Sequence, residues 1–135
     1  MSTRENLESI AIKWISLWST PVNWELFDSL HAEYFEDCSA AGRAPTKEGF
    51  AKGLSEIVRA FPDLQTVVNG LVIDESKSQV AVRWVAQGTN QKRFLGIGPT
   101  KNLTTLKGIE IIEIKDSRIV RRWGEWDISN HAEGT

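Results

Sequence analysis

Apolar residues in the first part of the chain recur every three or four positions, which predicts helices. Residues 2–5 have the form of a capping box, a hydroxyl followed three positions later by Glu. A first helix is therefore predicted to start there and to end before Pro21. Asn23 can cap a short second helix from Trp24 to Leu30. The segment from Tyr34 to Cys38 is ambiguous, and we interpret it as a short strand or an extended piece.

After a loop at residues 40–45, Thr46 can cap a third helix, which Pro62 stops. Beyond Pro62 the apolar period changes from helical to two. Residues 66–73 are predicted to form a strand, and residues 74–78 a polar turn. The next strand has one apolar face, formed by Val80, Val82, Trp84 and Ala86.

Residues 89–102 form a long connection, and the last two strands form a hairpin from Leu106 to Asp127. Helices first and strands afterwards predict an α+β fold, a cone in which three N-terminal helices pack on one face of a curved antiparallel sheet. The chain has 135 residues without linker or repeat, so residues 1–135 are expected to form one domain. Such a cone can hold a small apolar molecule between helices and sheet.

The hairpin places a carboxylate in a row of side chains that otherwise avoid water. Every second residue of a strand points to the same face, and here that row is Leu106, Gly108, Glu110, Ile112 and Ile114. A short loop at residues 116–118 puts Gly124 opposite Glu110, with Arg122 and Trp126 as diagonal neighbours. This combination indicates a pocket wall. The alternative is a structural ion pair between Glu110 and Arg122 that only tolerates burial.

Composition argues against several classes of function. Hydrophobic residues at 41% and charged residues at 25% are globular values. The net charge of −2, with no long Lys/Arg cluster, argues against nucleic-acid binding. No apolar run is long enough to span a membrane and no signal-peptide core is present. The single cysteine, Cys38, fits a reducing compartment, so we expect a cytoplasmic protein.

The two histidines, His31 and His131, lie far apart with no Cys or carboxylate at ligand spacing. We therefore predict no protein-held zinc or iron site. His31 ends the short second helix, where the simplest interpretation is a favourable charge near the helix C-terminus.

Several short phrases in this order resemble a known family. They are Phe61-Pro62-Asp63, Gly96-Ile97-Gly98-Pro99-Thr100, Gly108-Ile109-Glu110-Ile111, Asp116-Ser117-Arg118-Ile119-Val120 and Trp123-Gly124-Glu125-Trp126-Asp127. Together they are similar to the SnoaL-like polyketide cyclases of the nuclear-transport-factor-2-like superfamily, whose fold is a cystatin-like α+β cone. The resemblance covers the chain from the first helix to Asp127.

The resemblance implies an enclosed apolar pocket and a cofactor-free aldol cyclisation, in which a carboxylate of the last strand and a His of the preceding strand move the proton. Counted from the Asp-x-Arg-Ile turn, the family's His position falls on Glu110 and its Asp position on Gly124. The superfamily also contains isomerases, dehydratases and proteins that only bind ligands. We therefore expect a cofactor-independent enzyme that acts on an apolar, carbonyl-bearing molecule, with Glu110 and Arg122 as catalytic residues. The alternative is a non-catalytic ligand-binding protein or one with a vestigial pocket.

Six further side chains are candidates for contact with a ligand. Four are tryptophans, whose flat rings can wall a pocket but also serve as ordinary core residues. Two follow the second helix, where a polar side chain can face the cone. The six are Trp14, Trp18, Tyr34, Cys38, Trp84 and Trp126.

The opposite face of the last strands also carries large side chains, Ile109, Ile111, Arg121 and Trp123. A sheet with apolar residues on both faces needs two covers. Helices cover one face, and a second subunit can cover the other. We therefore expect a homodimer packed through the sheets.

Overall fold

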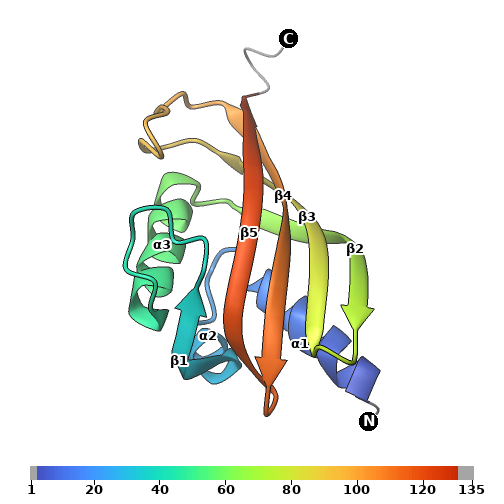
Figure 1. Ribbon diagram of the computed structural model, residues 1–135. Coiled ribbons are helices and arrows are strands. Elements are labelled where there is room, and N and C mark those ends of the chain that lie inside the picture. The colour runs from blue at the N-terminus through green and yellow to red at the C-terminus, as the bar shows by residue number, and fades with distance from the viewer. Residues whose placement is uncertain (1–2, 131–135) are drawn as a thin grey trace.

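The computed structural model describes residues 3–130 and packs three helices against a curved, open sheet of five strands (Figure 1). This confirms the predicted α+β class and the predicted packing of helices on a sheet. In chain order the elements are α1 (Thr3–Ser16), α2 (Trp24–Leu30), β1 (His31–Asp37), α3 (Lys47–Ala60), β2 (Gln65–Asp74), β3 (Gln79–Thr89), β4 (Leu103–Lys115) and β5 (Arg118–Asn130).

The strand order across the sheet is β1-β5-β4-β3-β2. Neighbouring strands are antiparallel except β1 and β5, which run parallel, so the prediction of a wholly antiparallel sheet is wrong at this edge. Parallel partners need a long crossover. Here the crossover contains α3 and three strands, and sequence alternation within one strand cannot reveal such a partner.

Two of the three helices begin at the predicted caps. The N–H of Leu26 donates to Asn23 Oδ1 over 3.0 Å at the start of α2, and the N–H of Gly49 donates to Thr46 Oγ1 over 3.1 Å in α3. The first helix ends at Ser16, well before Pro21. Its predicted capping residue at position 2 lies outside the described residues.

The core lies between the helices and the inner face of the sheet. Helix α1 packs on β2 and β3, and α3 packs beside β1. The predicted apolar face of β3 is confirmed, because Val80 and Val82 are fully buried and Ala86 nearly so. The long connection is held together by Asn90, a buried residue whose side-chain oxygen accepts the N–H of Thr100 over 2.8 Å. The connection extends beyond the sheet at the end where β3 stops (Figure 1).

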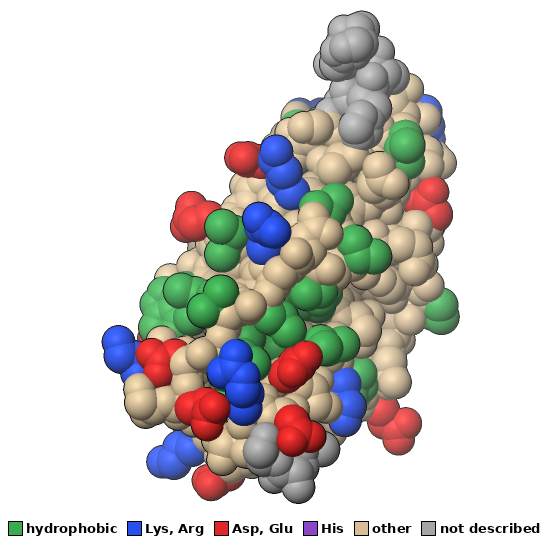
Figure 2. Space-filling view, turned by 90° about the vertical axis from the view of Figure 1, so that its right-hand side faces the viewer, with side chains coloured by type: hydrophobic (Ala, Val, Ile, Leu, Met, Phe, Trp, Pro, Cys, Tyr) green, Lys and Arg blue, Asp and Glu red, His purple; other side chains and the backbone are tan. Residues whose placement is uncertain are grey.

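Strand β2 forms an open edge of the sheet. Its outward side chains include Val67 and Val72, which are 59% and 71% exposed. On this side of the molecule apolar side chains lie among Lys, Arg, Asp and Glu (Figure 2). Charged neighbours of this kind discourage an open strand from pairing with another chain. No helix within residues 3–130 is long and apolar enough to cross a membrane.

Candidate functional site

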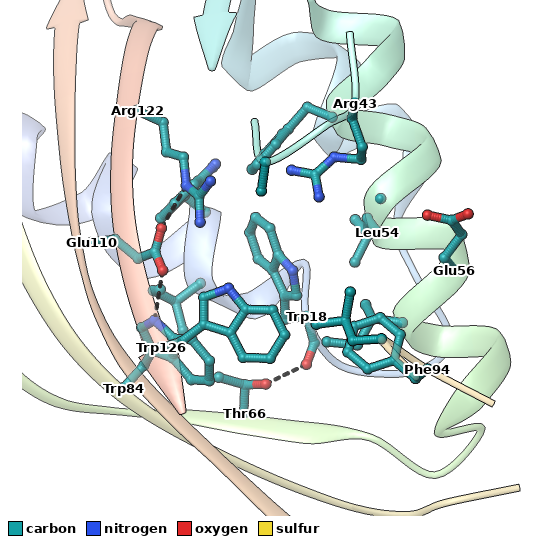
Figure 3. Close-up of a pocket in the computed structure, with 17 residues that line it drawn as sticks. Trp18, Arg43, Leu54, Glu56, Thr66, Trp84, Phe94, Glu110, Arg122 and Trp126 are labelled. Carbon is teal, nitrogen blue, oxygen red and sulfur yellow. Dashed lines mark hydrogen bonds and ion pairs between the residues drawn. The ribbon is translucent and has the colours of Figure 1, made fainter. Parts of the chain in front are cut away.

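A cavity of about 160 Å³ lies between α1, α3 and the inner face of the sheet (Figure 3). Six of the residues that line it are aromatic: Trp14, Trp18, Phe50, Trp84, Phe94 and Trp126. Charged groups face it from four positions, Arg43, Glu56, Glu110 and Arg122. Four of the six predicted ligand contacts, the four tryptophans, thus line one cavity together with both predicted catalytic residues.

Glu110 and Arg122 form the predicted ion pair, with Arg122 Nε 2.7 Å from Glu110 Oε1. Both residues are buried, at 4% and 6% exposure. The other carboxylate oxygen, Oε2, accepts the indole N–H of Trp84 over 3.1 Å. Both oxygens therefore have a donor, and the carboxylate stays fixed at the cavity wall (Figure 3).

The register behind this pair is the predicted one, but the turn differs. Glu110 lies opposite Gly124, as expected. The loop contains two residues, Asp116 and Ser117, both with positive φ, and not three. A bulge in β5 between the partners of Glu113 and Ile114 then restores the register. A tight hairpin turn followed by one extra residue gives the same pairing as a three-residue loop.

Gly124 makes room for the ion pair. A Cβ atom added there would overlap Glu110 Oε1 and Arg122 Nη2 and would lie 2.7 Å from Glu110 Cδ. Any side chain at position 124 must therefore displace the carboxylate or the guanidinium. The N–H of Gly124 donates to Ser39 Oγ over 3.0 Å, which ties β5 to the segment that follows β1.

Asp37 is a site residue that sequence reasoning missed. Its carboxylate is fully buried and lies between two guanidinium groups. Oδ1 accepts from Arg122 Nη1 over 3.0 Å, and Oδ2 accepts from Arg43 Nη2 over 2.9 Å. The main-chain N–H of Ser39 also donates to Oδ1, over 3.0 Å. Four side chains therefore form one continuous chain of charges: Arg43, Asp37, Arg122 and Glu110.

Tyr34 and Cys38 do not line this cavity, contrary to expectation. Tyr34 is 67% exposed and the Cys38 thiol is also exposed. Side chains alternate along β1, and the inward positions near its end belong to Phe35 and Asp37. Tyr34 and Cys38 each lie one position away from an inward-facing residue, and a shift of one position moves a side chain to the other face of a strand.

His31 is not a surface charge at a helix end, which corrects our interpretation. The ring is fully buried, with Nδ1 2.7 Å from the carbonyl oxygen of Phe27. Nε2 is 3.0 Å from the indole nitrogen of Trp14, which can only donate. These partners require a neutral ring protonated at Nδ1. Burial lowers the pKa of His31 to about 4, in agreement with that form. His31 thereby orients Trp14 in the cavity wall.

Comparison with known proteins decides the family. The family model "SnoaL-like polyketide cyclase" matches residues 9–132. The chain belongs to this family. No curated protein sequence matches it. The buried carboxylate of this member lies on β4, and the position opposite it on β5 is Gly124.

Solved structures with the same fold include two candidate polyketide cyclases and a candidate hydroxylase. A candidate polyketide cyclase from Bacillus cereus is 21% identical, with a TM-score of 0.77, and the match covers 94% of this chain and 79% of that one. IdmH from Streptomyces antibioticus, also a candidate polyketide cyclase, is 23% identical, with a TM-score of 0.76 and coverage of 90% and 91%. AclR from Streptomyces galilaeus, a candidate hydroxylase, is 20% identical, with a TM-score of 0.78 and coverage of 93% and 77%. At these identities the likeness shows the fold alone.

The electrostatics of this SnoaL-like site favour proton exchange at Glu110. Burial raises the pKa of Glu110 above its ordinary value, against the opposing effects of Arg122 and the Trp84 N–H. The pKa of Arg122 is also raised, because two carboxylates outweigh its own desolvation, so the guanidinium stays charged. A carboxyl group that titrates closer to neutral pH than an exposed one can both accept and return a proton.

Metal ligands do not gather at this site. Within residues 3–130 there is no group of three or more His, Cys, Asp or Glu side chains placed to hold a metal ion. The site offers the carboxylates of Glu110 and Glu56, the guanidinium groups of Arg43 and Arg122, and aromatic walls as its chemical groups.

Proposed function

We propose that this protein binds an apolar, carbonyl-bearing small molecule in the cavity and catalyses proton transfer on it without a cofactor, in the manner of a cyclase or an isomerase. The observation that carries this proposal is the buried Glu110 carboxylate at an aromatic cavity. A Leu or Val would complete the same row without the desolvation cost that a carboxylate has in this place.

The residues suggest a simple division of roles. Glu110 removes a proton from the carbon next to the carbonyl group, and the electron pair of that C–H bond moves to the carbonyl oxygen. Arg122 stabilises the oxyanion of this enolate, because its Nη2 makes no hydrogen bond to another described residue. The protonated Glu110 then returns the proton, to the same carbon or to another atom. The tryptophan rings hold the flat part of the substrate.

A second candidate function is ligand binding without catalysis. Gly124 at the family's Asp position favours it, and so do the hydrogen bonds that already occupy both oxygens of Glu110. The ion pair between Glu110 and Arg122 would then have a structural role and no part in catalysis.

Deuterium exchange of a simple ketone separates the two candidates. We expect the protein to speed exchange of the α-protons of 2-tetralone in D2O, observed by proton NMR. Glu110→Gln keeps the shape of the side chain but cannot take up a proton, and the enhancement should fall by roughly 100-fold or more. Glu113→Gln, the same change on the outer face of β4, should leave the rate intact. An equal rate in wild type and Glu110→Gln would remove Glu110 from catalysis and leave ligand binding.

We also propose that two copies of the chain pair through the outer face of the sheet. Ile109, Ile111 and Trp123 are 55%, 38% and 36% exposed there, on the neighbouring strands β4 and β5. Apolar area of this kind is a common dimer surface. The exposed thiol of Cys38 supports a reducing, cytoplasmic location.

A further inference from the structure

Arg43 lies at the cavity in an unusual setting. The residue follows a tight turn in which Ala41 and Gly42 both have positive φ, and its N–H donates to the carbonyl of Ala40 over 3.1 Å. The side chain is mostly buried, with 30% exposure. Figure 3 shows its guanidinium on the same side of the cavity as that of Arg122. The loop after β1 therefore brings a second cation to the site.

The guanidinium of Arg43 rests on a glycine of α3. A Cβ atom added to Gly53 would lie 2.9 Å from Arg43 Nε and 3.0 Å from Arg43 Cζ. Glycine inside a helix costs about 1 kcal/mol relative to alanine. The missing methyl group of Gly53 is what lets Arg43 lie flat against the helix at the cavity.

One donor of Arg43 is buried and unused. Nη2 donates to Asp37, but Nε has no hydrogen-bond partner among the described residues. A buried donor on a charged group is costly unless something accepts from it. An oxygen that enters the cavity reaches this Nε–H only if the Arg43 side chain shifts. Arg43 Nη1 and Arg122 Nη2 make no hydrogen bond to another described residue and are free to donate to such an oxygen.

The order of the charges leaves a place for an anion at Arg43. Asp37 is the one carboxylate held between the two guanidinium groups, and Glu110 lies beyond Arg122. With Glu110 ionised, as its role as a base requires, the four charges of this chain balance, and Glu56 is a further acidic residue that lines the cavity. An acidic group of a ligand is therefore attracted to the Arg43 end of the chain, the end farthest from Glu110.

We propose that Arg43 is a specificity-determining residue that binds an acidic group of the substrate, so that the ligand is a flat aromatic compound with a carboxylate or an ionised hydroxyl. This inference rests on the proposed function, because it names the class of molecule that the same cavity takes. Guanidinium groups suit planar oxyanions, to which they donate two parallel hydrogen bonds.

Two probes of equal shape test this assignment, 2-naphthoate and its neutral isostere 2-naphthamide, titrated by calorimetry. Wild type should bind the acid about tenfold more tightly than the amide, the usual worth of a hydrogen bond to a charged group. Arg43→Gln should weaken binding of the acid about tenfold and binding of the amide by less, so that the preference is lost.

Gly53→Ala gives an independent test. Its methyl group should push Arg43 off the helix and reduce the preference. The gain from alanine as the better helix former offsets part of the weakened contact with Asp37, so the variant should still unfold cooperatively. A loss of the preference in a variant that unfolds cooperatively and still binds the amide cannot be explained by misfolding.

The outcomes separate the two proposals. A preference for the acid that survives in Arg43→Gln and Gly53→Ala would overturn the role of Arg43. Amide binding without any preference in wild type would also overturn it and leave the proposed function standing. If neither probe binds to wild type at millimolar concentration, the cavity does not take flat aromatic ligands and both proposals fall.

Discussion

Replacing Gly124 by alanine should disrupt the ion pair between Glu110 and Arg122 by steric overlap. The new methyl group would overlap Glu110 Oε1 and Arg122 Nη2, so one of these side chains must move. Overpacking of a core by a methyl group costs about 1–3 kcal/mol. Loss of a hydrogen bond between charged, buried groups costs about 1.5–3 kcal/mol. We expect Gly124→Ala to lower the free energy of unfolding by about 3 kcal/mol.

Thermal and urea unfolding can measure this loss. For a domain of this size about 3 kcal/mol corresponds to a fall of roughly 9 °C in melting temperature. Gly70→Ala is the matched control, because Gly70 is also a strand glycine but an added Cβ would come no closer than 3.4 Å to the Arg83 side chain. That control should change stability by less than about 0.5 kcal/mol.

A double variant shows whether the loss of stability in Gly124→Ala comes from overlap with the Glu110–Arg122 pair. In a Glu110→Ala background the carboxylate is absent and Arg122 can move into the space that it leaves, so Gly124→Ala should cost less than about 1 kcal/mol. An equal cost in both backgrounds would refute the steric argument. So would a Gly124→Ala protein with the stability of wild type.

Three further predictions follow from the titrating groups and the outer face. The pKa of His31 is about 4 in the folded protein and about 6.5 in the unfolded chain. The free energy of unfolding should therefore fall by up to about 3 kcal/mol as the pH drops from about 6.5 to 4. Urea unfolding at several pH values measures this fall, which should be smaller in His31→Gln. Arg122→Gln removes the cation that favours ionised Glu110, so the acidic limb of the pH–rate profile should move to higher pH, and an unmoved limb would exclude Arg122 from the mechanism. Wild type should have twice the 15.2 kDa chain mass by light scattering, and Trp123→Glu should be monomeric; a monomeric wild type at micromolar concentration would rule out the dimer.

The parts of the fold that were predictable are set by nearby residues. The caps Asn23 and Thr46 and the alternation along β3 depend on contacts within a few positions. The opposition of Glu110 and Gly124 was also predictable, because the hairpin joins them through 13 residues of continuous strand and turn. Local rules sufficed even though the turn itself was different, since the bulge compensated for the shorter loop.

The missed parts depend on partners far away in the chain. Asp37 stands in an acidic, polar stretch and looks like a surface residue in sequence. Its burial results from Arg122, 85 positions away, and from the parallel pairing of β1 with β5. The same pairing determines which side of β1 faces inward, and this is why Tyr34 and Cys38 were misplaced. His31 was misread because its acceptor role depends on Trp14 of another helix.

The parallel contact between β1 and β5 also has a consequence for the order of folding. Strands β2 to β5 are joined as successive antiparallel neighbours, which can form by short-range closure. The carboxylate of Asp37 can meet Arg122 only after the last strand has been made and has closed a loop of 85 positions. We therefore expect the chain to pair strands β2 to β5 first, and to add β1 and complete the charged wall of its cavity in the final step.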